Sequence, residues 1–100
     1  MVKLVALYAR PADPEAFDRH YHGVHLGLVR AYPGLRKLEV TRVTGAPIGE
    51  ASVRVMAEMY FDDKNAMESA LASPAGKAVT RDLLSFAASI VTVFFGEVEA

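Results

Sequence analysis

Two helix starts, each a capping residue followed directly by proline, constrain the fold of this chain more than any other feature. Asp13 precedes Pro14, and Ser73 precedes Pro74. Aspartate and serine side chains accept hydrogen bonds from the free amides of a first helical turn, and proline suits the first helical position because it has no amide hydrogen. The sequence therefore predicts one helix that begins at Pro14 and another that begins at Pro74.

Strand-like segments surround these helices. Pro33-Gly34 ends the first helix near Tyr32, a short helix capped by Asp62 or Asp63 covers residues 64–72, and the last helix runs to about residue 86. Runs rich in β-branched and aromatic residues predict strands at 2–10, 35–44, 53–61 and 90–98. The order is β-α-β-β-α-β over one domain, residues 1–100. This is the α+β, ferredoxin-like arrangement: a four-stranded antiparallel sheet with helices on one face.

The first and last predicted strands are apolar on both faces, and 52% of all residues are hydrophobic. When helices cover only one face of a sheet, the other face meets water or a partner. We therefore expect a homodimer that packs sheet to sheet. The surplus of apolar surface could also line a ligand pocket.

Composition excludes several classes of function. A formal net charge of −1 provides no electrostatic surface for nucleic acid or an anionic membrane. Cysteine is absent, which excludes disulfides, thiolate metal sites and a cysteine nucleophile. The apolar stretch at the N-terminus is too short for a signal peptide or a membrane span, so the expected location is the cytoplasm.

The three histidines, His20, His22 and His25, lie within six positions of the first predicted helix. A metal site needs ligands that converge on one ion, and only His22 and His25 have a helical i, i+3 spacing. We therefore expect no metal, and we expect His20 and His22 to lie at the surface. The stripe predicted to face the sheet comprises Phe17, Tyr21, Val24, Leu28 and Tyr32.

His25 falls at the edge of this stripe, next to Tyr21. An imidazole there, near Tyr8 and Tyr60 of the predicted sheet, could line a pocket and act as an acid or base near neutral pH. Residue chemistry alone favours the other interpretation, a packing residue whose ring nitrogens bond to backbone or water. The residues alone leave both interpretations open.

Glu58 lies between apolar neighbours in the third predicted strand. Its carboxylate could face the same pocket, or it could be solvated or paired with Arg42 or Arg54.

Two stretches carry spaced motifs. HYHGVHLGLVRAYPGL, residues 20–35, contains Tyr-x-x-x-His-x-x-Leu followed by Pro-Gly-Leu. EMYFDDKNAMESALASPAGKAVTRDLLSF, residues 58–86, contains Phe-Asp, Ala-Met and Ala-Ser-Pro-x-Gly, followed by Asp82 and Phe86. Both stretches, and the closing TVFFGEVE, resemble the EthD family.

The resemblance implies a dimeric α+β barrel, with a pocket between helices and sheet in each subunit. Families that share this architecture include cofactor-free cyclases and isomerases, small monooxygenases, haem-degrading enzymes and stress proteins, so the fold does not fix the reaction. We expect a homodimer that binds a small apolar or aromatic carbonyl compound without a cofactor. In this hypothesis His25 is the acid/base. Tyr21 and Tyr60 orient the substrate by hydrogen bonds, and the side chains of Tyr8 and Phe86 line the pocket. The alternatives are a non-catalytic accessory protein of an oxidative degradation system and a cofactor-free monooxygenase.

Overall fold

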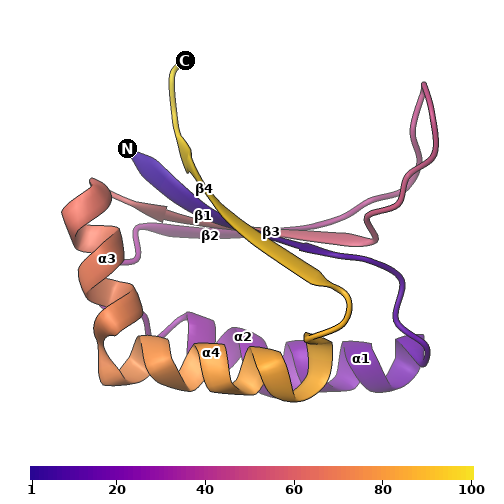
Figure 1. Cartoon of the computed structure of the whole chain (residues 1–100), viewed down its shortest axis with the longest axis horizontal. Helices are drawn as coiled ribbons and strands as arrows, with labels where there is room; N and C mark the ends of the chain where they lie inside the picture. The colour runs from indigo at the N-terminus through magenta and orange to yellow at the C-terminus, as the bar shows by residue number, and fades with distance from the viewer.

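The computed structural model describes residues 1–100 and contains one four-stranded antiparallel sheet. Its strands are β1 (Val2–Tyr8), β2 (Lys37–Arg42), β3 (Val55–Phe61) and β4 (Val91–Glu97), in the spatial order β2-β3-β1-β4. The helices lie together on one side of this sheet (Figure 1). The predicted β-α-β-β-α-β order and ferredoxin-like class are confirmed, and each strand is slightly shorter than predicted.

The helical segments are α1 (Pro14–His20), η1 (Tyr21–His25), α2 (Leu26–Val29), α3 (Lys64–Ala72) and α4 (Pro74–Ala87). The predicted caps are present. The Asp13 side chain accepts a hydrogen bond from the Ala16 amide at 3.1 Å, and the Ser73 hydroxyl accepts one from Gly76 at 3.0 Å. Asp63, rather than Asp62, caps α3. None of these helices is long and apolar enough to span a membrane.

The first helix is not the regular α-helix that the sequence predicts. Its middle, η1, is a π-helical turn in which the Leu26 amide donates to the Tyr21 carbonyl, five residues back. Such a turn acts like a one-residue insertion and shifts every later side chain around the helix axis. As a result His25, at 2% exposure, takes the sheet-facing place that the regular pattern gives to Val24, which is 46% exposed.

The core lies between the helices and the inner face of the sheet, where Leu4 of β1 pairs with Met59 of β3. The helix layer closes tightly at Gly76, where a Cβ atom would lie 2.1 Å from the Ala70 carbonyl oxygen. Glycine at this position therefore lets α4 begin directly against the end of α3.

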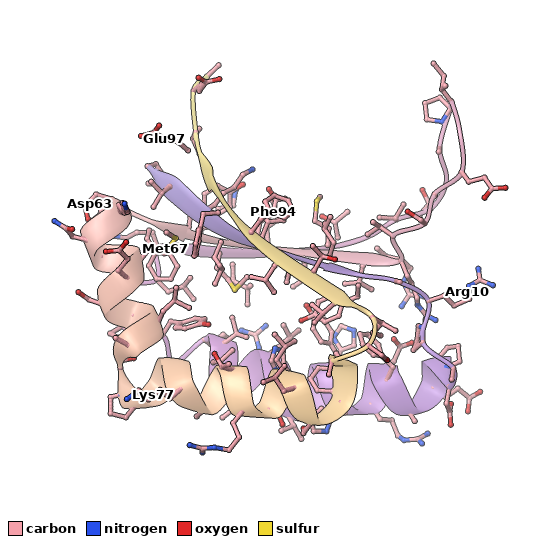
Figure 2. All side chains as sticks on the ribbon, in the orientation of Figure 1. Arg10, Asp63, Met67, Lys77, Phe94 and Glu97 are labelled. Atoms are coloured by element: carbon pink, nitrogen blue, oxygen red, sulfur yellow. The ribbon has the colours of Figure 1, made fainter.

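The outer face of the sheet carries the alternate side chains, and Phe94 points away from the helices there (Figure 2). Glu58 lies on this face and forms an ion pair with Lys3. It therefore faces neither the helices nor the two arginines considered from the sequence; Arg54 instead bonds to Asp18 at 3.1 Å.

Candidate functional site

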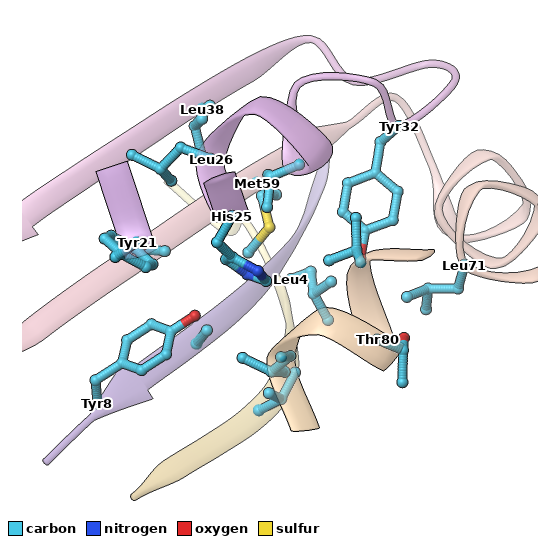
Figure 3. Close-up of a pocket in the computed structure, with 16 residues that line it drawn as sticks. Leu4, Tyr8, Tyr21, His25, Leu26, Tyr32, Leu38, Met59, Leu71 and Thr80 are labelled. Atoms are coloured by element: carbon cyan, nitrogen blue, oxygen red, sulfur yellow. The ribbon is translucent and has the colours of Figure 1, made fainter. Parts of the chain in front are cut away.

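An apolar cavity of about 190 Å³ lies between the helices and the inner face of the sheet (Figure 3). Fourteen of its sixteen lining residues are hydrophobic, counting tyrosine among them, and the other two are His25 and Thr80. Cavities of this character take compact apolar ligands, and a few polar groups fix the orientation. The lining residues are Leu4, Ala6, Tyr8, Tyr21, His25, Leu26, Val29, Tyr32, Leu38, Ala57, Met59, Leu71, Val79, Thr80, Leu83 and Val93.

The cavity approaches the surface where α4 runs beside the edge strand β4. Thr80 of α4 and Val93 of β4 both line the cavity, and both are exposed to solvent, Val93 to 44%. The neighbouring Leu83 is partly exposed. These side chains place the mouth of the cavity between α4 and β4.

His25 is the central polar group of the cavity wall. Its Nδ1 lies 2.8 Å from Oδ2 of Asp82, which projects from α4. Because an ionised carboxylate only accepts hydrogen bonds, Nδ1 carries the hydrogen and the neutral ring keeps its lone pair on Nε2. The η1 turn and the Asp82 contact together hold this imidazole against the cavity.

Burial lowers the pKa of His25 below its ordinary value, although the hydrogen bond and charge of Asp82 oppose that shift. Burial of Asp82 by itself would raise its pKa, but hydrogen bonds from His25 and His20 outweigh burial and lower the pKa overall. At neutral pH the pair is therefore a neutral imidazole beside a carboxylate. Such a pair can accept a proton at Nε2, and the carboxylate then stabilises the imidazolium.

Tyr21 packs against His25, and Tyr8 packs against Tyr21. The Tyr21 ring stacks on it at a centroid distance of 5.7 Å, and Tyr8 meets Tyr21 edge-on at 5.2 Å. The Tyr21 hydroxyl is buried without a well-formed hydrogen bond, and the hydroxyl of Tyr8 is the polar group that interacts with it. Burial raises the pKa of Tyr21 and of Tyr32 to about 12 and raises that of Tyr8 as well, so all three phenols stay neutral donors. An unsatisfied buried hydroxyl at a cavity wall is a ready donor for a ligand oxygen.

Not every predicted site residue lies at the cavity. Tyr60 does not line it: Tyr60 pairs with Lys3 across the sheet and lies on the outer face, with its hydroxyl 3.5 Å from Glu58. Phe86 lies behind the cavity wall, with its ring 5.0 Å from that of His25 and 4.5 Å from that of His20.

The structure adds two residues to those predicted. Asp82 fixes His25, and Tyr32 lines the cavity. In the sequence, Asp82 is only one position of a motif that resembles the EthD family, and nothing local predicts its role. His20 lies at the surface, partly exposed, but its Nε2 also lies 2.9 Å from Oδ1 of Asp82, a contact that the sequence did not predict.

Comparison with known proteins assigns the chain to a family. Residues 9–89 match the EthD domain. The chain belongs to the EthD family. A crystal structure of an EthD-family protein from Bacillus halodurans is 44% identical, covers 99% of both chains and superposes with a TM-score of 0.95. An uncharacterised 11.0 kDa protein from the thcB-thcC intergenic region of Rhodococcus erythropolis is 32% identical over 99% of this EthD chain and 96% of its own length.

More distant solved structures share the fold of this EthD protein. SnoaB of Streptomyces nogalater, a cofactor-independent oxygenase, is 15% identical with a TM-score of 0.72, over 99% of this chain and 93% of its own. A dimeric protein of unknown function with a ferredoxin-like fold from Bacteroides fragilis is 18% identical, with a TM-score of 0.67 over 97% and 95% of the two chains. At these identities the likeness establishes the ferredoxin-like fold alone.

Proposed function

We propose that this EthD-family protein binds a small apolar or aromatic carbonyl compound and catalyses proton transfer on it without a cofactor. The observation that carries the proposal is the His25–Asp82 pair, which presents a neutral imidazole to a cavity that is otherwise almost entirely apolar. A carboxylate-oriented histidine in a concave apolar site is a typical general base.

The reaction follows from the groups at the wall. The Nε2 lone pair of His25 removes a proton from the carbon next to the carbonyl, and the electron pair of that C–H bond moves onto the carbonyl oxygen as an enolate. The hydroxyls of Tyr21 and Tyr8 donate hydrogen bonds to this oxygen, where negative charge develops. The imidazolium, stabilised by Asp82, then returns the proton to another atom of the ligand, which completes an isomerisation or prepares a cyclisation.

The cavity size limits the ligand. A cavity of roughly 150 Å³ lined by apolar side chains is enough to bind benzene. The cavity here, about 190 Å³, is somewhat larger. We therefore expect a compound with one ring or a short branched chain and one carbonyl group.

A second candidate starts from the same proton removal. The enolate can react with dioxygen, which adds to the carbon that lost its proton, and an apolar lining suits both partners of that step. A cofactor-independent oxygenase among the proteins of the same fold supports this alternative. A third outcome is an accessory protein that holds the ligand without turnover.

We also propose that the protein is a homodimer that packs through the outer face of the sheet. The partly exposed Leu7 and Met56 and the 44% exposed Phe94 contribute apolar surface to that face. The dimeric ferredoxin-like protein from Bacteroides fragilis supports the proposal. Light scattering at micromolar concentration tests it, and a monomer would rule it out. The cytoplasm stays the predicted location.

The function is tested in two steps. A thermal-shift screen against single-ring ketones, lactones and aromatic acids finds ligands, because a compound that binds the folded state raises Tm by mass action. Proton NMR in deuterium oxide then follows exchange of the hydrogens next to the carbonyl of each ligand found. The wild-type protein should accelerate that exchange.

The matched variants are His25→Asn, whose amide keeps a donor near the Nδ1 position, and His22→Asn, which changes an exposed histidine of the same turn. We expect His25→Asn to lower the exchange rate by roughly 10²- to 10⁴-fold, the usual contribution of a general base, and His22→Asn to leave it unchanged. Exchange that survives in His25→Asn would refute the assignment. Binding without exchange would identify an accessory protein, and ligand-dependent oxygen uptake an oxygenase.

A further inference from the structure

The carboxylate of Asp82 lies within hydrogen-bond distance of two histidines, His20 and His25. Asp82 accepts from Nδ1 of His25 at 2.8 Å, and both of its oxygens lie within hydrogen-bond distance of Nε2 of His20, at 2.9 and 3.0 Å. The two imidazoles come from the two ends of the same helical turn, five residues apart, while Asp82 comes from α4. A carboxylate held by two ring nitrogens has its plane and direction fixed.

The three side chains run from the cavity to the solvent. The exposed fraction of the side chain alone rises from 3% for His25, through 15% for Asp82, to 33% for His20. His25 lines the inner cavity, and His20 lines a separate surface hollow together with Phe86 and Ser89. A proton from solvent therefore reaches His20 directly, while His25 is reached only through the cavity or through Asp82.

We propose that His20 is a positioning residue that sets the basicity of His25 through their shared carboxylate, Asp82. This inference rests on the proposed acid/base role of His25. With His20 neutral, the full negative charge of Asp82 stabilises an imidazolium at His25. A proton on His20 neutralises part of that charge, so His25 then holds a proton less strongly and keeps its Nε2 lone pair free.

The charges around the pair agree with this arrangement. A charge on His20 lowers the pKa of His25, in the same direction as burial and against Asp82. The other titratable groups that face the pair are Tyr8 and Tyr21, both neutral phenols, on the cavity side, and Asp13, which borders the surface hollow of His20. None of these groups has a hydrogen bond to either imidazole, so Asp82 is the direct link between them.

The test is an NMR titration of the ¹⁵N-labelled imidazoles in the ligand-free protein, which reports the protonation and the tautomer of each histidine. The variants are His20→Gln, whose amide can still donate to Asp82 but cannot take up a proton, and His20→Leu, which removes the donor. The control is His22→Gln, an exposed histidine of the same turn that has no bond to Asp82.

In the wild-type protein we expect the Nδ1–H tautomer of His25, because Nδ1 donates to Asp82. In His20→Gln the midpoint of His25 should rise, because no charge can form at position 20, and the tautomer should be retained. In His20→Leu the midpoint should also rise, and the tautomer should become mixed. His22→Gln should change neither property.

An unchanged His25 midpoint in His20→Gln, or an Nε2–H tautomer in the wild-type protein, would overturn the proposal. His20→Gln decides the question even if His20→Leu does not fold. The titration needs no substrate, so it can refute the coupling while turnover stands, and it stays readable if no compound is turned over. Where a ligand is found, the pH profile of proton exchange in His20→Gln should move with the His25 midpoint.

Discussion

Replacing Tyr21, which is only 1% exposed, with phenylalanine should make this protein more stable. Its buried hydroxyl makes no well-formed hydrogen bond and interacts only with the Tyr8 hydroxyl, and an unsatisfied buried hydroxyl costs about 1–3 kcal/mol of folding free energy. Phenylalanine keeps the ring, which stacks on Phe17 at 5.4 Å and on His25 at 5.7 Å. The lost hydroxyl is thus the main change, and we expect a gain of about 1–2 kcal/mol.

Urea denaturation measures this gain as a higher midpoint with an unchanged m-value. In a domain of this size a gain of about 1 kcal/mol raises Tm by roughly 4–8 °C. Protein concentration must be the same for both proteins, because the stability of a dimer depends on it. The control is Tyr60→Phe on the outer face, which loses only a long contact with Glu58 and should change stability by less than about 0.5 kcal/mol.

The same Tyr21→Phe variant should bind carbonyl ligands more weakly, because it lacks a donor for the ligand oxygen. A stability gain together with a loss of affinity is the signature of a group that is unsatisfied until ligand arrives. A loss of stability of more than about 1 kcal/mol would refute this reasoning. It would mean that the hydroxyl is already bonded in the empty protein, for example to water or to Tyr8.

Three further predictions concern stability. Gly76→Ala should cost roughly 3 kcal/mol, measured by urea denaturation, because its Cβ would strike the Ala70 carbonyl oxygen at the α3–α4 junction. Gly27→Ala, at an exposed position of α2 where a Cβ meets no atom within 4 Å, should instead stabilise the protein by about 0.5–1 kcal/mol in the same assay. The unfolding free energy should fall as pH drops below the ordinary pKa of histidine, because His25 takes up its proton more readily in the unfolded chain, and this pH dependence should be weaker in His25→Asn. At more acid pH a further loss of stability should follow as Asp82 is protonated, because its pKa is lowered in the folded protein.

The sequence predicted the fold well because its signals were local. Caps at Asp13, Asp63 and Ser73 act within one helical turn, so the starts of three helices could be inferred without any knowledge of their neighbours. Strand runs likewise depend on the composition of a few consecutive residues. The order of these elements then left few arrangements other than a ferredoxin-like sheet.

The candidate site was harder to predict because it depends on long-range geometry. Strand β3 has apolar residues on both faces, so alternation alone could not show which face Tyr60 takes. Glu58 and Tyr60 are two residues apart in the strand, so their side chains lie on the same face of the sheet. The charge of Glu58 was the only feature of the sequence that indicated that this face points away from the helices. Asp82 is 57 residues from His25 in sequence, and only the packing of α4 against η1 brings the two together.

The π-helical turn connects these observations. Without it, a regular helix would present Val24 to the sheet and would turn His25 toward the edge, so the cavity wall there would be apolar throughout. With it, the wall carries an imidazole that Asp82 can reach, directly beside the unsatisfied hydroxyl of Tyr21. π-turns are rare and occur frequently at functional sites, because their less regular hydrogen bonding must be offset by something else. Here the turn begins at Tyr21 and ends at His25, the two polar residues that the proposed chemistry needs most, which argues that it is retained for the site and not for the fold.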